Sequence, residues 1–344
     1  MKKMFLFVLT VLFGFSVYSE NIKSAEAQKV MDYLTSVYGN KIISGQMDLT
    51  WSDSTDMLKR IYKDTKTYPV IYGFDFMNYT NRQGNGLNQV EEALKWWDGD
   101  YKYDTSYKGY KGGLVAFCWH WRAGKENQFY TDKTTFRIPF ENGKLNMEAD
   151  SFKKIKKDLD EIAKHLGRLK NLGVPVLWRP LHEASGGWFW WGASGEDAYK
   201  ALYKYMYTYF TEEKNLDNLI WIWNGQNEKW YPGDDYVDIV GEDIYSNDHS
   251  SQKLSFLLSK NITDGNKMVC LSECGRIPDP ICCKQDNACW LYFMVWNDAT
   301  TSGSVFTKED FWSSSVVNSL EFRQKVYSSP FVITLDKVKP GDYK

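Results

Sequence analysis

Eight short apolar runs recur along the chain, each followed by a loop and usually by a segment with helical periodicity. Near-continuous apolar strands that alternate with helices are typical of a parallel sheet covered on both faces. Eight such units predict a single closed (β/α)8 TIM barrel, a fold of the α/β class. The runs are Lys41–Gln46, Tyr68–Asn78, Gly113–Trp121, Val174–Glu183, Leu219–Asn224, Val237–Tyr245, Met268–Cys274 and Trp290–Asp298.

The segment Phe152–Leu169 shows the helical period most clearly. Its apolar residues recur at intervals of three and four, and lysines occupy most of the other face, as in an amphipathic helix with a solvated side. Glu196–Phe210 and Asp310–Tyr327 predict two further outer helices. Trp97–Gly113 and Ala123–Asn146 lack such a pattern and predict long loops.

An open, doubly wound sheet is the alternative architecture. It would require a glycine-rich phosphate loop directly after an early strand. The candidate segment, Gly84–Gly86, does not follow a strand in the required way. The closed barrel is therefore the preferred interpretation.

The first twenty residues have the pattern of a secretory signal peptide. Lys2 and Lys3 precede an apolar run from Met4 to Val17, and small or polar residues follow. The run is shorter than the ~20 residues that a membrane-spanning helix needs. We therefore expect a signal peptide over residues 1–19, cleaved near Ser19, and a catalytic domain over residues 20–344. The mature protein should be secreted, extracellular or periplasmic, without membrane attachment.

Cysteine usage fits an exported protein, in which disulfides are permitted. Four of the six cysteines fall close together, which predicts one or two local disulfides whose pairing the sequence leaves open. Cys118 and Cys270 lie inside apolar strands and are expected to be buried. No paired CxxC spacing supports a zinc site. The clustered cysteines are Cys274, Cys282, Cys283 and Cys289.

Charge and aromatic content narrow the functional class. With a formal net charge of −2, the chain lacks the excess of basic residues that is typical of proteins that bind nucleic acid. Aromatic residues make up 17% of the chain, with 15 Trp and 23 Tyr, which is more than a core requires. Because Tyr and Trp suit surfaces that are apolar on one side and wet on the other, the surplus predicts an aromatic binding surface.

Polar and aromatic residues are concentrated at the carboxyl ends of the predicted strands. In a TIM barrel these ends form one rim, where active sites are built. Strand ends that carry polar and aromatic residues on one rim predict a polar, aromatic-lined groove for a carbohydrate. The residues are Asp75, Asn78, Trp119, His120, Trp121, Arg122, Arg179, His182, Glu183, Trp223, Asn224, Gln226, Glu242, Asp243, Tyr245, Glu273, Trp296, Asn297 and Asp298.

The most informative segment is VPVLWRPLHEASGGWFWWG, from Val174 to Gly192. It places Arg179, His182 and Glu183 at a strand end, before the aromatic run Trp188–Trp191. A carboxyl group can transfer a proton, polar groups can hold hydroxyls, and flat rings can stack on a pyranose. The segment predicts a sugar-cleaving site; the alternative is a surface glutamate beside an aromatic core patch.

Two carboxylates stand out on this rim. Glu183 closes the fourth predicted strand and Glu273 closes the seventh, so they can face each other across the barrel mouth. A gap of ~5 Å would suit double displacement with retention of configuration. Aromatic rings near Glu183 should raise its pKa and keep it protonated as the acid, whereas Tyr245 could hydrogen-bond an anionic Glu273.

Glu242 and Asp243, on the sixth predicted strand, are competitors for these roles. Strand alternation should direct one of them inward and the other outward. We rank both below Glu273 because each could instead serve packing or bind a ligand hydroxyl.

The run RPLHEASGGWFWWG resembles the acid/base segment of glycoside hydrolase family 26. IISGQ, YPGDDYVDIVGEDIY, LSECG and SSPFVITLDKV also look like landmarks of that family, so the resemblance covers nearly the whole mature chain. It implies a retaining glycosidase of clan A on a (β/α)8 barrel, with catalytic glutamates on strands four and seven. Most members are β-mannanases, and some act on mixed-linkage β-glucan or β-1,3-xylan.

Position by position, the resemblance implies that Glu183 is the acid/base and Glu273 the nucleophile. It implies no metal and no cofactor, a β-mannan polysaccharide as substrate, and a monomer. Its departures, at Ala184-Ser185, at Glu242 and in the cysteine-rich segment, bear on substrate preference more than on mechanism. The substrate-binding roles it implies are a hydroxyl contact for His182, a hydrogen bond to the nucleophile for Tyr245, sugar stacking for Trp188 and Trp296, and support of carboxylates and hydroxyls for Arg179 and His120.

Two other classes of protein are less compatible with the sequence. A non-catalytic carbohydrate-binding barrel would keep the tryptophans and lose one or both carboxylates, yet Glu183 and Glu273 are both present. A metal-dependent hydrolase would need several histidines at strand ends, where only His120 and His182 qualify.

Overall fold

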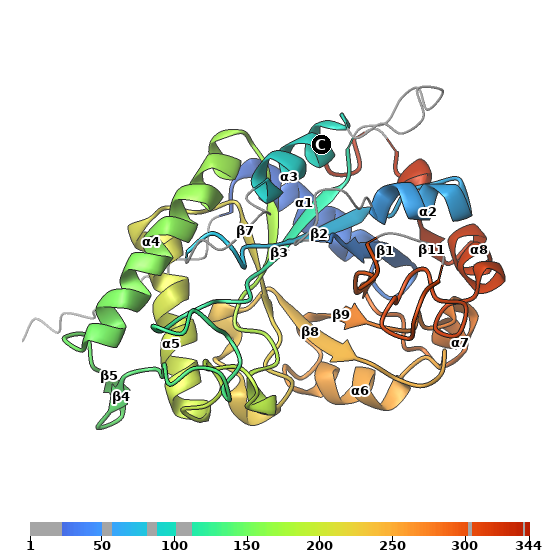
Figure 1. Ribbon diagram of the computed structural model, residues 1–344. Coiled ribbons are helices and arrows are strands. Elements are labelled where there is room, and N and C mark those ends of the chain that lie inside the picture. The colour runs from blue at the N-terminus through green and yellow to red at the C-terminus, as the bar shows by residue number, and fades with distance from the viewer. Residues whose placement is uncertain (1–22, 50–56, 81–87, 101–111, 302–304, 340) are drawn as a thin grey trace, which may run out of the picture.

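The computed structural model describes residues 23–49, 57–80, 88–100, 112–301, 305–339 and 341–344. Eight parallel strands close into a barrel, because the last of them pairs with the first, and helices surround it (Figure 1). All eight predicted strands are confirmed, and so is the TIM barrel. The barrel strands are β1 (Ile42–Met47), β2 (Ile71–Asp75), β3 (Leu114–Cys118), β6 (Val176–Arg179), β7 (Leu219–Trp223), β8 (Ile239–Ile244), β9 (Met268–Cys274) and β10 (Tyr292–Val295).

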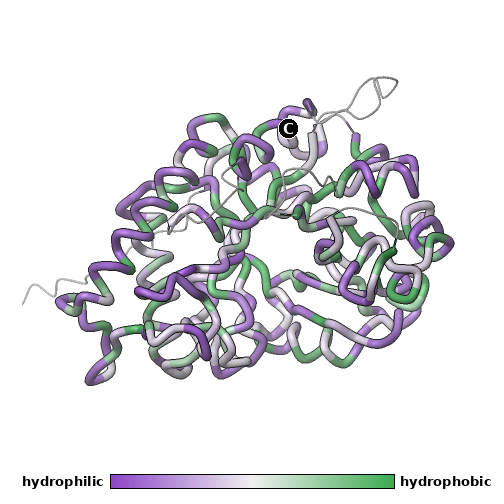
Figure 2. The backbone as a smooth tube through the Cα atoms, in the orientation of Figure 1, coloured by the Kyte–Doolittle hydropathy of each residue, from purple (hydrophilic) through white to green (hydrophobic). Residues whose placement is uncertain are grey.

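The helices follow the strands in sequence and cover the barrel from outside. The predicted helix at Phe152–Leu169 is confirmed and is slightly longer, and that at Glu196–Phe210 continues into the π-helical turn Tyr209–Glu213. In Figure 2 hydrophobic and hydrophilic residues alternate along α4, as its two faces require. The α-helices are α1 (Ala25–Val37), α2 (Met57–Thr65), α3 (Gln89–Asp98), α4 (Asp150–Asn171), α5 (Glu196–Thr208), α6 (Lys253–Asn261), α7 (Pro280–Gln285) and α8 (Leu320–Ser328).

The predicted helix at Asp310–Tyr327 is wrong over its first half. Helix α8 begins only after Ser319, whose hydroxyl caps it by accepting the backbone N–H of Phe322 at 3.2 Å. Upstream, the Asp310 carboxylate accepts the backbone N–H groups of Thr300 and Thr307, both at 2.6 Å. A side chain that binds the backbone in this way competes with helix formation.

The remaining elements are short. Strand β11 (Val332–Ile333), which the sequence did not predict, pairs with the start of β1 in parallel. The predicted loop Ala123–Asn146 contains a small hairpin of β4 (Phe140–Glu141) and β5 (Lys144–Leu145). Much of the predicted loop Trp97–Gly113 and the whole predicted signal peptide lie outside the described residues. Single 3-10 turns occur at Ala184–Gly186, Glu228–Trp230, Asp234–Tyr236 and Leu335–Lys337.

Tryptophan fills much of the core. Ten indoles are almost completely buried, so most of the aromatic surplus packs the barrel and does not line a surface. This corrects the interpretation of the composition. Within the part of the chain that the structure describes, no helix has the length and apolar character to cross a membrane. The ten are Trp96, Trp119, Trp121, Trp178, Trp190, Trp191, Trp221, Trp223, Trp290 and Trp312.

The predicted local disulfides are wrong, because all six cysteines are free thiols. Cys282 and Cys283 are neighbours on α7 and therefore point in different directions; Cys283 is buried and Cys282 is partly exposed. Cys274 is buried in β9, and Cys289 approaches the carbonyl oxygen of Cys283. Closeness in sequence does not give the side-chain geometry that a disulfide needs. Cys118 and Cys270 are buried, as expected.

Candidate active site

A strained turn after β6 aims Glu183 into the barrel mouth. Leu181 and Glu183 both have φ near 53°, in the left-handed region that residues other than glycine seldom adopt. The turn is held from the residue that follows β7, since the Asn224 carbonyl accepts the Glu183 N–H at 2.7 Å. Such strain persists only where surrounding contacts enforce it, and it is concentrated at functional sites.

Trp188 lies directly beside Glu183. Its indole N–H donates to the Glu183 carboxyl at 2.9 Å, and the side chain is 45% exposed. Gly186 makes this approach possible, since a Cβ there would lie 2.1 Å from the indole ring. Trp188 is thus a flat, half-exposed surface held against a carboxyl group, which is the arrangement that sugar stacking requires.

The prediction that the other rings of the run Trp188–Trp191 can stack on a sugar is wrong. Phe189, Trp190 and Trp191 are buried and cannot stack on a ligand. The Trp190 indole donates to the carbonyl of Trp121 at 2.7 Å, and that of Trp191 to the carbonyl of His182 at 2.8 Å. They hold the backbone around the site in place.

A bulge in β9 aligns two more carboxylates with the mouth. Leu271 is opposite Glu242 and Glu273 is opposite Asp243, so Ser272 is the extra residue. Bulges commonly redirect side chains next to active sites. The Ser272 hydroxyl donates to Asp243 at 2.6 Å.

The alternation predicted for the sixth strand is confirmed. Asp243 points into the barrel, whereas Glu242 points outward and accepts a hydrogen bond from Ser259 of α6 at 3.0 Å. Asp243 therefore belongs to the polar centre, and Glu242 does not.

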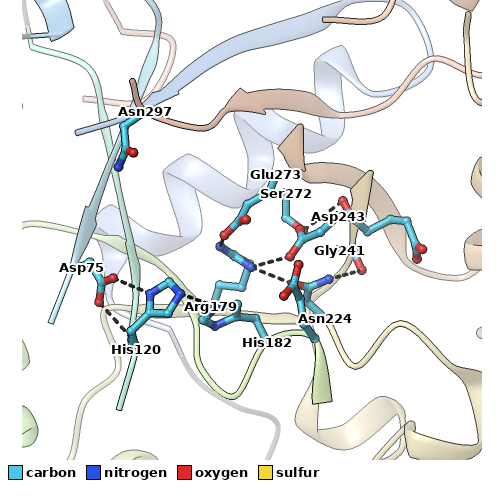
Figure 3. A network of polar contacts seen from close by, with 12 residues as sticks. Asp75, His120, Arg179, His182, Asn224, Gly241, Asp243, Ser272, Glu273 and Asn297 are labelled. Atoms are coloured by element: carbon cyan, nitrogen blue, oxygen red, sulfur yellow. Dashed lines mark hydrogen bonds and ion pairs between the residues drawn. The ribbon is translucent and has the colours of Figure 1, made fainter. Parts of the chain in front are cut away.

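Arg179 stands at the centre of this site (Figure 3). Its guanidinium forms ion pairs with Asp243, at 2.9 Å, and with Glu273. It also donates to the Asn224 amide oxygen at 2.7 Å. On the other side of Glu273, the Tyr245 hydroxyl donates to the carboxylate at 2.9 Å. A buried cation and a phenol therefore both bind the anionic form of Glu273.

Glu183, Asp243 and Glu273 form one carboxylate cluster. Each offers an oxygen, and these oxygens lie within 4.8 Å of one another. Burial raises the pKa of Glu183 to about 7, with the charge of Asp243 acting in the same direction. Burial also raises the pKa of Glu273, while Arg179 acts in the opposite direction. The cluster holds three carboxyl groups and one guanidinium, which contacts only Asp243 and Glu273, so the cluster retains a proton near neutral pH.

The contacts place that proton on Glu183. Glu273 and Asp243 both touch Arg179, which stabilises their anions, whereas Glu183 has no ion pair among the described residues. The nearby Asp243 raises the pKa of Glu183 further, which favours its protonated form. The result is a protonated carboxyl facing an anionic one across a short gap, the combination that general acid catalysis with a nucleophile needs.

Two histidines border the cluster. His182 and His120 face each other through their Nε2 atoms at 3.3 Å, and Asp75 lies 2.6 Å behind His120. Burial, with the nearby charge of Arg179, lowers the pKa of His182 well below its ordinary value, so the ring is neutral. Trp296, partly exposed, has its ring centre 5.8 Å from that of His120.

Several other rim residues have structural roles. Trp119 and Trp121 are buried and stacked with ring centres 4.0 Å apart. Asn297 donates to the carbonyl of Asp48 at 2.7 Å, and Asp298 is buried in an ion pair with Arg60. A polar residue at a strand end can hold a loop as readily as a ligand.

Tyr130 was missed by sequence reasoning. It lies in the loop after β3, is 39% exposed, and its ring stacks on that of Phe189 at 5.6 Å. Burial raises its pKa, with a contribution from the charge of Glu183, so the two groups are near each other. A tyrosine within a loop of irregular sequence carries no signal that would have identified it.

The site residues are poorly suited to a metal ion. In the carboxylate cluster the cation is Arg179 itself. A second group, Asp75, Cys118 and His120, is compact, but burial raises the pKa of the Cys118 thiol well above its ordinary range, and a thiol must lose its proton to ligate.

A TIM barrel with a protonated and an anionic carboxyl at the ends of its fourth and seventh strands defines a glycoside hydrolase. The family model for glycosyl hydrolase family 26 matches residues 19–337, and the chain belongs to that family. The resemblance seen in the sequence is thereby confirmed.

Curated relatives are similar to this chain over most of its length. A mannan endo-1,4-beta-mannosidase of Thermothelomyces thermophilus is 34% identical over 328 residues, which is 92% of this chain and 62% of that protein. Mannan endo-1,4-beta-mannosidase B of Piromyces sp is 38% identical over 280 residues, 79% of this chain and 46% of that protein. The chain thus spans less than two thirds of the length of these curated relatives.

Solved structures share the fold. The GH26-CBM35 β-(1,4)-mannanase of Podospora anserina superposes with a TM-score of 0.80 at 35% identity, over 94% of this chain and 69% of that one. A β-mannanase from a symbiotic protist of the termite Reticulitermes speratus, complexed with gluco-manno-oligosaccharide, gives 0.78 at 37% identity, over 93% and 96%.

Proposed function

We propose that this protein is an endo-β-1,4-mannanase that cleaves mannan, glucomannan or galactomannan by double displacement with retention. The observation that carries the mechanism is the approach of Glu183 and Glu273 oxygens to within 4.8 Å. Retaining glycosidases need carboxyls about 5–5.5 Å apart, whereas inverting ones need room for a water. The mannanase relatives support the choice of substrate.

In the first step, a Glu273 oxygen attacks the anomeric carbon and forms a glycosyl ester. The bond to the glycosidic oxygen breaks, and that oxygen takes the proton of Glu183 as the leaving chain departs. Tyr245 and Arg179 hold the Glu273 carboxylate in line for the attack.

In the second step, Glu183 is an anion and removes a proton from a water molecule that attacks the anomeric carbon. The ester bond breaks, Glu273 is released as a carboxylate, and Glu183 regains its proton. Both inversions occur at the same carbon, so the product keeps the configuration of the substrate.

Sugar binding uses the exposed rings and the polar groups beside them. Trp188 would stack on the sugar beyond the scissile bond, because it is half-exposed and contacts Glu183. Trp296 would form the floor for the sugar before that bond, and His120 would border its hydroxyls, while the buried His182 contacts His120 from behind. The proposed steps use no metal or cofactor, and the proposed partner is a polysaccharide of the β-mannan type.

Product analysis on mannan, barley β-glucan and β-1,3-xylan in parallel tests the substrate. Mannan should yield manno-oligosaccharides of several lengths, with the β-configuration at the new reducing end. Ala184 and Ser185, beside the acid, are where the chain departs from the family pattern, and this is why the other two glycans are included. Faster cleavage of glucan or xylan than of mannan would contradict the mannan assignment but not the chemistry.

We also propose that the mature protein is secreted, after cleavage near Ser19. The charged and apolar pattern of residues 1–19 supports this proposal. Expression of the full chain in its host, followed by N-terminal sequencing of protein from the medium or periplasm, tests it. An intact Met1 on the active protein would contradict it.

The pH profile should fall on its alkaline side as Glu183 loses its proton. With the pKa raised to about 7, the acid form is present below that pH and lost above it. The profile of kcat/KM should therefore fall about tenfold per pH unit above about pH 7. A rate that stays constant up to pH 9 would be inconsistent with Glu183 as the acid.

The Trp188→Phe variant should separate stacking from hydrogen bonding. The phenyl ring still offers a flat surface, but the indole N–H that lowers the pKa of Glu183 is lost. We expect the alkaline limb of the pH profile to shift upward and KM to rise by less than in Trp188→Ala. Parallel pH profiles for wild type and Trp188→Phe would mean that this hydrogen bond does not tune the acid.

A further inference from the structure

A carboxylate and two imidazoles form a buried chain behind the carboxylate cluster (Figure 3). Asp75 ends β2, His120 follows β3, and His182 immediately precedes Glu183. Their exposed fractions are 1%, 8% and 1%. Neither step of the proposed reaction uses Asp75, so the reason for a buried carboxylate at this point needs a separate explanation.

The contacts of Asp75 fix where the proton of His120 lies. One Asp75 oxygen accepts the backbone N–H groups of Met77, at 2.9 Å, and of His120, at 3.0 Å. The other oxygen lies 2.6 Å from Nδ1 of the His120 ring. A carboxylate only accepts, so Nδ1 of His120 must carry a proton and donate it.

This arrangement extends to the second histidine. With its proton on Nδ1, a neutral His120 presents Nε2 as an acceptor to Nε2 of His182, 3.3 Å away. His182 is itself neutral, because burial and Arg179 lower its pKa. Its single proton therefore lies on Nε2 and is donated to His120.

The opposite arrangement is less favourable. A charged His120 could donate from Nε2, but His182 would then hold its proton on Nδ1. That atom is fully buried and has no hydrogen-bond partner among the described residues. Orphaned buried N–H groups are rare because their desolvation is not repaid.

We propose that Asp75 is a positioning residue for the glycosidase reaction, acting through the tautomers of His120 and His182 on the adjacent Glu183. The hydrogen bonds from Asp75 through His120 hold the His182 ring in place. The Trp191 indole N–H donates to the His182 carbonyl at 2.8 Å. Together they hold the strained backbone from which Glu183 projects. The kinetic part of this inference rests on the proposed function; the tautomer part does not.

The tautomers can be read directly by NMR of the whole protein labelled with 15N-histidine, without substrate. The chain has four histidines, so the signals can be assigned by substitution. In the wild type, His182 should carry its proton on Nε2 and His120 should carry one on Nδ1. A proton on Nδ1 of His182 would overturn the proposal without any variant.

The Asp75→Asn variant should reverse the direction of the hydrogen bonds that link residue 75, His120 and His182. The amide oxygen still accepts from the two backbone N–H groups, but the amide nitrogen now donates toward Nδ1 of His120. The proton of His120 moves to Nε2, and that of His182 moves to Nδ1. We expect kcat on mannan to fall about 10²-fold or more, with a smaller change in KM, since a wrong tautomer or a misplaced catalytic group has that order of effect.

Asp158→Asn is the matched control. Asp158 on α4 is a buried carboxylate that accepts the ring N–H of Trp121 at 2.9 Å, outside the histidine chain. It should lose stability without changing kcat or either tautomer.

An Asp75→Asn enzyme with kcat within about twofold of the wild type would overturn the positioning role. A wild type inactive on every β-glycan would remove the proposed function and leave the tautomer result standing.

Discussion

Replacing Glu273 by Gln is expected to lower kcat on mannan by roughly 10⁴-fold or more, because no other group can form the glycosyl ester. Glu273 is buried and bound by Arg179 and Tyr245, so the amide fits the same space with little change of fold. Initial rates on mannan, with circular dichroism to confirm folding, provide the measurement. Near-normal turnover would show that Glu273 is not the nucleophile.

Glu183→Ala should be equally defective on mannan but should behave differently on an activated aryl mannoside. A good leaving group needs no proton, so the first step survives and the glycosyl ester accumulates. Added azide should then accelerate turnover and give a β-mannosyl azide, because this anion needs no general base. Glu273→Ala should form no glycosyl ester, and any product that azide gives with it should be the α-mannosyl azide, because azide then attacks directly in the space of the missing carboxylate.

Glu242→Gln is the matched control for both glutamates. Glu242 is a partly buried glutamate on β8, but it faces α6 and binds Ser259. Its replacement should leave kcat close to that of the wild type. If Glu273→Ala gave the β-mannosyl azide and Glu183→Ala the α-mannosyl azide, the two roles would have to be exchanged.

The barrel and the catalytic pair could be predicted from sequence because both depend on local pattern. Each strand is an apolar run, and Glu183 and Glu273 each stand at the end of one. Once strands are ordered around a barrel, their carboxyl ends must meet. That Glu183 and Glu273 face each other follows from the strand order, whereas the approach of their oxygens to within 4.8 Å depends on the turn that carries Glu183 and on the bulge in β9.

The errors arose where the outcome depends on packing or on a distant partner. Sequence could not show which ring of Trp188–Trp191 faces solvent, since the answer depends on the left-handed turn before it. Asp75 and His120 were recognised separately, but their contact depends on the register of β2 and β3, which sets Asp75 opposite Cys118. Because neighbouring side chains of a strand face opposite sides, Glu242 and Asp243 had to point in opposite directions. The sequence pattern did not show which of them faced inward.

Arg179→Met should destabilise the protein by about 3–5 kcal/mol near pH 7, the usual cost of leaving buried charges without their partner. Arg179 is the one cation that contacts Asp243 and Glu273 among the described residues. Methionine fills most of the same volume, so lost packing contributes little. Urea denaturation at several pH values between about 5 and 8 measures the difference.

The pH dependence of the stability difference between Arg179→Met and the wild type shows that the loss of stability is electrostatic. Without the guanidinium, the pKa of Glu273 and of Asp243 should rise further above the unfolded value, so the folded state binds more protons than the unfolded state. Stability then falls as pH rises through that interval, and the gap to the wild type widens. Arg179→Lys should lie between the two, because a single ammonium cannot contact both carboxylates as the planar guanidinium does. Curves for Arg179→Met and wild type that run parallel would show that Arg179 acts through packing and not through its charge.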